Sequence, residues 1–316
     1  MDNEREKHLL SNPVTGCTVS FIAFILIIIL IIFTEFAYLL ISRQSVDFSI
    51  GKAFTLFTAT GLFSYGLWYL LIGAGAIDEL GLRINRNILT QFPIGFLTGA
   101  AGIALALGVM VLSGVELKII DISKSTNENE IHFSLAGSFI LILLAAGYEE
   151  IILRGLLYRM LRKSTGIWWA LSLSSLAFSL FHIGNANLNA IGLLDIFLAG
   201  AALCLWREVT GDLWMAWGVH LGWNYTTIIS GLPVSGYLFN IKEVPYRISL
   251  NGSELITGGE FGPEGGIAGI AGCVFLTVVP LVILLKKWRT DRFNRIPPKD
   301  PIPDSHHPDD GEDPGQ

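Results

Sequence analysis

The sequence predicts an all-α fold, a polytopic membrane helix bundle of about eight transmembrane helices. Of its 316 residues, 52% are hydrophobic and 15% are charged, and the mean hydropathy is +0.56. A soluble domain is nearer about 25% charged. The apolar residues also come in long runs, and about 20 such residues are enough to cross a bilayer. The net charge of −6 comes mainly from loops and tail, without a basic patch interleaved with aromatics. The expected surroundings are therefore a lipid bilayer, and nucleic acid is not an expected partner.

The apolar runs divide the chain, in order, into the expected spans. They cover residues 17–41, 53–77, 92–112, 135–157, 167–182, 190–206, 213–230 and 265–285. The fourth span is expected to end at the basic residues from Arg159 onward, and two longer polar loops are expected at 114–133 and 231–264. Gly95, Gly99 and Gly102 form a small-residue stripe on the third span, which predicts close helix packing.

We expect one transmembrane helical domain over residues 1–295 and a disordered, acidic, Pro-rich tail over 296–316. An even number of spans places both termini on one side of the membrane. The basic residues are concentrated in the segments on that side, so the positive-inside rule places both termini in the cytoplasm. The three cysteines are far apart and lack CxxC spacing, which predicts neither a disulfide framework nor a thiolate metal site.

Three charged residues stand together within the fourth apolar run: Glu149, Glu150 and Arg154. Each charge at that depth costs roughly 2.5–3.5 kcal/mol on insertion scales. Glu150 and Arg154 are i,i+4 neighbours on one helix face and can pair. Glu149 points about 100° away and is left to face something else. A structural pair that joins helices would explain Glu150 and Arg154, but it leaves Glu149 unexplained.

Two further spans carry polar residues at helical spacing. Phe178 and His182 share one face of the fifth span, and His220 and Asn224 share one face of the seventh. A single buried histidine is more often a packing residue, but ionisable groups on three spans typically face one another or a water-filled cavity. Such a set suits hydrolysis, with a glutamate as general base and with His and Asn either stabilising an oxyanion or positioning a metal.

Two other acids lie in apolar runs. Asp195 is a second functional candidate in the sixth span, although a position near a helix N-terminus would also explain it. Glu35 lies near the end of the first span and is expected to reach the membrane interface rather than to take part in chemistry.

The three clusters, in this order, resemble the three motifs of the CAAX protease and bacteriocin-processing family of intramembrane proteases, which includes the type II CAAX prenyl endopeptidases. The resemblance covers about 135–230, and the ordered triple is far more specific than any one motif. The residues that carry it are Glu149-Glu150-xxx-Arg154, Phe178-xxx-His182 and His220-xxx-Asn224.

The resemblance implies an intramembrane endopeptidase in a bacterial cell membrane, with a site that opens toward the cytoplasm. It implies that Glu149 activates water and that Arg154 holds Glu150. His182, His220 and Asn224 would stabilise the oxyanion, and Phe178 would contact the substrate. The implied partner is a membrane-associated protein or peptide, of which a prenylated CAAX protein is one candidate.

Two questions stay open at this stage. No HExxH motif is present, so we expect no required cofactor, but Glu149, His182 and His220 could hold a zinc ion with an open position. The polar cluster would also suit a non-catalytic membrane adaptor or an ion- or proton-coupled transporter. The sequence, however, shows no internal repeat of the transporter kind, and no catalytic position is missing.

The expected boundaries create one conflict. At a rise of 1.5 Å per residue, Glu149 lies roughly 13 Å from the inner end of the fourth span, whereas His182 lies roughly 24 Å from the start of the fifth. A shared site requires the two side chains to lie at the same depth, so helix tilt, a re-entrant segment or a misplaced boundary has to bring them together.

Overall fold

A computed structural model describes residues 10, 12–42, 49–72, 75–122 and 132–294. It confirms the predicted all-α membrane bundle, because each of the eight expected apolar segments forms a helix. Among the described residues, six helices are long and apolar enough to cross a membrane. They are α2 (Pro13–Ser42), α3 (Ile50–Ile72), α5 (Ile88–Leu112), the continuous helix from Leu135 to Thr165, α9 (Ala190–Thr210) and α12 (Ile267–Asn294).

The other two expected segments form shorter helices. α8 (Ile167–Phe181) is apolar, and α10 (Trp214–Ile229) is largely buried within the bundle. The short helix α4 (Ala76–Leu80) connects α3 to α5. The tail predicted to be disordered, 296–316, lies outside the described residues.

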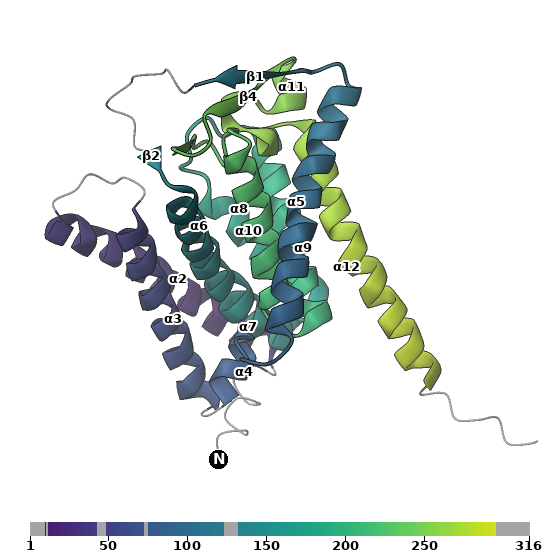
Figure 1. Cartoon of the computed structure of the whole chain (residues 1–316). Coiled ribbons are helices and arrows are strands. Elements are labelled where there is room, and N and C mark those ends of the chain that lie inside the picture. The colour runs from purple at the N-terminus through teal and green to yellow at the C-terminus, as the bar shows by residue number, and fades with distance from the viewer. Residues whose placement is uncertain (1–9, 11, 43–48, 73–74, 123–131, 295–316) are drawn as a thin grey trace, which may run out of the picture.

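The continuous helix from Leu135 to Thr165 begins with α6 (Leu135–Glu150) and ends with α7 (Tyr158–Thr165). The helices α6, α8, α9 and α10 lie at the centre of the bundle (Figure 1). α2 and α3 cover one side, and α5 and α12 cover the opposite side. The strands and α11 (Glu254–Thr257) gather at one end of the bundle, whereas α4 and α7 lie at the other end.

Glycines allow α5 and α10 to pack with their backbones in contact. A Cβ atom on Gly95 would collide with the carbonyl oxygen of Met215, and one on Gly99 with that of Val219. α10 contributes Gly222 in the same way, because its Cβ would collide with the backbone of Phe96. This contact confirms the close packing predicted for the glycine stripe of the third span.

The predicted end of the fourth span is wrong. The helix continues from α6 (Leu135–Glu150) through a π-helical segment, η2 (Ile151–Leu157), into α7 (Tyr158–Thr165). The basic residues that predicted a loop have acidic partners on other helices. Arg159 and Lys163 bind Glu79 at 2.6 and 2.9 Å, and Arg162 binds Glu208 at 2.9 Å. With their charges paired, these residues continue the helix instead of ending it.

The longer helix removes the conflict in depth. Glu149 lies 16 residues before Thr165, or roughly 24 Å along the helix, and His182 lies 15 residues after Ile167, or roughly 23 Å. The two helices meet at Gly166, whose φ of 84° suits a reversal of the chain. Glu149 and His182 therefore reach the same depth in the bundle.

The two long segments predicted as loops contain strands. β1 (Glu116–Asp121) pairs antiparallel with β4 (Tyr246–Asn251), in register from Glu116 opposite Asn251 to Asp121 opposite Tyr246. β2 (His132–Phe133) pairs in parallel with β3 (Asn240–Ile241). These contacts join segments far apart in the sequence and cover one end of the bundle.

Candidate active site

The charged residues of the continuous helix form the predicted pair. Arg154 Nη1 donates to Glu150 Oε1 at 3.0 Å, and both side chains are completely buried. The Arg154 guanidinium also lies 4.3 Å from the centre of the Phe178 ring on α8 and donates to the carbonyl oxygen of Gly200 on α9. The pair therefore joins three helices beneath the site.

His220 on α10 is the second partner of Glu150. Its Nδ1 lies 2.9 Å from Glu150 Oε1, and its Nε2 lies 3.8 Å from Glu149 Oε2. Because an ionised carboxylate only accepts hydrogen bonds, Nδ1 carries the proton in the contact with Glu150. One oxygen of Glu150 thus binds both Arg154 and His220, and the ring of His220 is oriented so that Nε2 faces Glu149.

The π-helical segment lies directly after the two glutamates. Ser174 on α8 donates to the carbonyl oxygen of Leu153 at 3.0 Å, and Trp68 on α3 donates to that of Gly155 at 3.3 Å. A π-segment departs from regular i,i+4 bonding and is frequent at functional sites. These two side chains satisfy backbone carbonyls within the segment and attach it to the neighbouring helices.

Glu149, His182, His220 and Asn224 line one cavity of about 410 Å³, here called the wide cavity. The Glu149 side chain is 21% exposed, and its Oε2 has no hydrogen-bond partner among the described residues. Glu149 and Glu150 are adjacent in the chain, yet only Glu149 lines this cavity. The structure thus brings together the acid, the two histidines and the amide that the sequence placed on three separate spans.

His182 is held by its own helix. It follows α8 directly, and its Nδ1 lies 2.9 Å from the carbonyl oxygen of Phe178. The Phe178 ring makes edge contacts with both His182 and His220, with ring centres 4.9 and 5.8 Å apart. Phe178 is itself 4% exposed and therefore positions the histidines from below. Its predicted contact with the substrate stays a prediction.

The wide cavity also includes charged residues that the sequence had not assigned to the site. Glu35 on α2 and Lys52 on α3 form a 3.0 Å pair and line the same cavity. Tyr148, Asn185 and Ser235 line it as well. Glu35 was expected at the membrane interface, and its position in an apolar run was the one sequence signal that could have indicated a role here.

Asp195, the second candidate acid, lies beside the site rather than in the wide cavity. It lines a smaller pocket that is also bordered by His182, His220 and Asn224. Glu264, which drew no attention in the sequence, lines this pocket too. Glu264 itself lies at the end of the long segment after α10, so nothing in the local sequence marked it.

The absence of a required metal stays a prediction from the sequence. Among the described residues, no group of three or more His, Cys, Asp or Glu side chains is arranged to hold a metal ion. The three predicted ligands, Glu149, His182 and His220, line the same cavity but do not form such a group.

Residues 131–226 match a family model described as type II CAAX prenyl endopeptidase, Rce1-like. The match includes all three polar motifs, and it confirms for this segment the family that the motifs predicted. No curated protein and no solved structure matches the chain. The helices α2, α3, α5 and α12 lie outside the matched segment.

Proposed function

We propose that the chain is a protease of the CAAX type, as the family match over residues 131–226 supports, and that it hydrolyses a peptide bond of a membrane-associated protein or peptide by means of a water molecule activated by Glu149. One observation carries the proposal. Of two adjacent glutamates, Glu150 is completely buried against Arg154 and His220, whereas Glu149 is 21% exposed and lines the wide cavity.

Glu149 suits the role of general base. A carboxylate beside a cavity of this size can accept a proton from a water molecule within it. The oxygen of that water then attacks the carbonyl carbon of the peptide bond, the proton passes to the leaving nitrogen, and the carbon–nitrogen bond breaks. Glu150 does not compete for the water, because its side chain is completely buried, does not line the wide cavity and is held through Oε1 by Arg154 and His220.

Asn224 suits the role of oxyanion donor. Its amide nitrogen donates hydrogen bonds at any pH, and it lines both the wide cavity and the smaller pocket. His220 faces the same space through Nε2, and it donates to an oxyanion when both ring nitrogens carry protons. We therefore propose that Asn224 and His220 stabilise the negative charge that develops on the carbonyl oxygen.

The tautomer of His182 suits this residue to positioning the attacking water. A backbone carbonyl only accepts, so Nδ1 of His182 carries the proton in its contact with Phe178. The neutral ring then offers Nε2 as an acceptor, which suits holding a hydrogen of the attacking water. In the imidazolium form, the same nitrogen would donate to the oxyanion instead, as the sequence motif implies.

The family match and the apolar exterior of the bundle support the proposed substrate class. Exposed apolar side chains cover α2 and α3, as expected of helices that face lipid. A substrate therefore has to approach the site from within or beside the membrane. A peptide anchored to the bilayer, of which a prenylated CAAX-type terminus is one form, suits this location. We assign no step to a metal.

The experiment that tests the function compares membrane-protein termini in cells that carry either the wild-type chain or Glu149→Gln. New termini that depend on Glu149 would identify substrates directly. Identical termini in the two strains, with both proteins present at equal levels, would contradict proteolysis and would leave the adaptor and transporter alternatives.

A further inference from the structure

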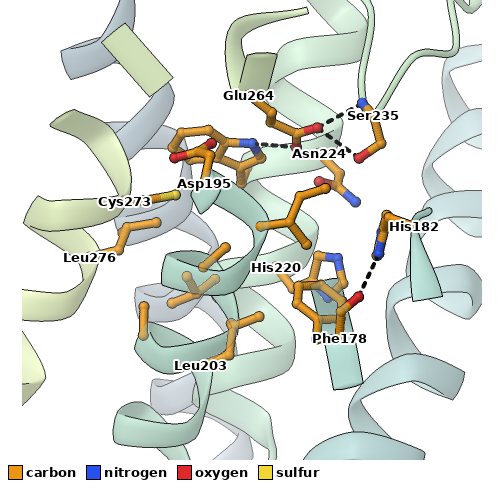
Figure 2. A pocket seen from close by; sticks show the side chains of 15 residues that line it. Phe178, His182, Asp195, Leu203, His220, Asn224, Ser235, Glu264, Cys273 and Leu276 are labelled. Carbon is orange, nitrogen blue, oxygen red and sulfur yellow. Dashed lines mark hydrogen bonds between the residues drawn. The ribbon is translucent and has the colours of Figure 1, made fainter. Parts of the chain in front are cut away.

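A smaller pocket, here called the side pocket, lies beside the wide cavity. Both are bordered by His182, His220, Asn224 and Ser235, so the side pocket adjoins the proposed catalytic groups. It extends between α9, α10 and α12 to Asp195 and Cys273 (Figure 2). Its walls are mostly apolar, formed by Phe178, Ile196, Ala199, Ala202, Leu203, Val219, Trp223 and Leu276.

Two carboxylates line the side pocket, and their surroundings differ. Glu264 Oε1 accepts from Trp223 Nε1 at 2.9 Å, and Glu264 Oε2 accepts from both the backbone nitrogen and the hydroxyl of Ser235 at 2.7 Å. Asp195 is 1% exposed, and neither of its oxygens has a hydrogen-bond partner among the described residues. Figure 2 shows the satisfied Glu264 at one border and Asp195 beside Cys273 at another.

An ionised carboxylate buried this deeply, with only the weakly donating thiol of Cys273 beside it, is costly unless it binds a proton or pairs with a cation. The described residues that line the side pocket include neither lysine nor arginine, so the protein itself brings no permanent positive charge to Asp195 there. A ligand with an apolar stem and a cationic end would supply both missing features. Lysine has this form, because its methylene chain lies along apolar surfaces while its ammonium group finds a polar partner.

We infer that the side pocket is a substrate subsite that binds the side chain of a lysine next to the cleaved bond, with Asp195 as the partner of its ammonium group. This inference rests on the proposed proteolytic function. The pocket volume is about 40 Å³, room for about three water molecules. That size suits the compact ammonium end of lysine better than the planar guanidinium of arginine.

The first test uses Cys273 as a reporter within the pocket and does not depend on proteolysis. With Cys17 and Cys204 replaced by alanine, Cys273 is the one remaining thiol of the chain. Three methanethiosulfonate reagents of similar size would be compared: aminoethyl (cationic), methyl (neutral) and sulfonatoethyl (anionic). If Asp195 attracts cations, the cationic reagent should modify Cys273 at least about tenfold faster than the neutral one, and the anionic reagent should be slowest.

Asp195→Asn should reduce this cationic-to-neutral rate ratio to near one. The ratio is the informative quantity, because a change in the intrinsic reactivity of the thiol affects all reagents alike. Glu35→Gln is the matched control, since it removes a carboxylate from the wide cavity and should leave the ratio unchanged. An unchanged ratio in Asp195→Asn, or a Cys273 that none of the reagents modifies, would overturn the inference.

The second test measures specificity with lipidated peptides that carry either lysine or norleucine beside the cleaved bond. Norleucine keeps the unbranched apolar chain without the amine. We expect the wild type to prefer lysine and Asp195→Asn to lower the lysine-to-norleucine ratio of kcat/KM by about tenfold or more. A preference that survives this substitution would contradict the subsite. Failure of the wild type to cleave any peptide would count against the proposed function, while the thiol-labelling ratio would still decide the nature of the pocket.

Discussion

The wide cavity and the side pocket share His182, His220 and Asn224 as lining residues, but the acid in each one has different surroundings. Glu149 lies in a space of about 410 Å³ with further polar and charged residues around it, and its side chain is partly exposed. Asp195 lies in a space of about 40 Å³ with mostly apolar walls and is almost completely buried. The carboxylate that water reaches is suited to accept a proton, whereas the one enclosed by apolar walls is suited to bind a cation.

Two consecutive glutamates, Glu149 and Glu150, also have different surroundings. Glu149 and Glu150 have the same side chain, but Arg154 and His220 bind only Glu150. The roles proposed for the two glutamates therefore depend on neighbours from η2 and α10 rather than on their own chemistry. Substitutions of these neighbours, or of the acids themselves, test the proposed difference.

The largest effect is expected at the acid of the wide cavity. Glu149→Gln keeps the shape of the side chain but removes the proton acceptor, and positioned acid–base groups contribute about 10²–10⁴-fold to the rate. Peptide cleavage by the purified protein should fall by at least about 100-fold while the melting temperature stays near that of the wild type. Glu116→Gln, at an exposed carboxylate that lines neither pocket, is the control and should retain the activity. Full activity in Glu149→Gln would contradict the assignment of the base.

A loss of stability is expected where Glu150 loses its partner. Arg154→Ala leaves a fully buried carboxylate with only His220 beside it, and breaking a buried pair costs about 3–5 kcal/mol. Thermal or denaturant unfolding in detergent should show this loss. Arg83→Ala removes an exposed pair with Asp78 and should cost about 1 kcal/mol or less. Equal stability of the two variants would show that the buried pair is not required for folding.

A smaller loss of rate is expected for Asn224, one of the residues that line both the wide cavity and the side pocket. Asn224→Ala removes the proposed oxyanion donor, and such a donor is worth about 10²–10³ in kcat. The effect should appear in kcat more than in KM, because the hydrogen bond forms mainly in the transition state. An increase in KM alone would instead make Asn224 a substrate-binding residue.

A modest effect of pH on stability is expected from Glu79, which lines neither the wide cavity nor the side pocket. Burial raises the pKa of Glu79, but the hydrogen bonds and charges of Arg159 and Lys163 outweigh it, so its pKa is lowered overall. A carboxyl group whose pKa is lower in the folded state stabilises the fold above its unfolded pKa, near about 4.3. That contribution is lost as the pH falls through the folded pKa. The melting temperature should therefore fall less between pH 6 and pH 3 in Glu79→Gln than in the wild type.

No effect is expected from metal removal. We expect active, purified protein to contain no stoichiometric zinc by elemental analysis and to keep its activity in the presence of chelators. Zinc at one equivalent per chain, lost and restored together with activity, would overturn this expectation. His182→Ala and His220→Ala would then also abolish metal binding, because each would remove a ligand.

Local patterns in the sequence determined the membrane class, the helical segments and the polar positions of the three motifs. Hydropathy and i,i+4 spacing need only nearby residues, so the pair of Glu150 with Arg154 could be predicted directly. The glycine stripe that brings α5 against α10 could be predicted for the same reason, because small residues at helical spacing indicate close packing wherever the partner lies.

The tertiary structure decided which polar groups meet. The fourth span runs to Thr165 because Glu79 and Glu208, distant in sequence, pair with its basic residues. This extension brings Glu149 level with His182, and no window of local sequence contains those partners. The contact between His220 and Glu150, the position of Glu35 in the wide cavity and the isolation of Asp195 depend in the same way on packing between separate helices. The sequence specifies the side chains, but the charges, solvent exposure and neighbours of each side chain depend on contacts between residues far apart in the chain.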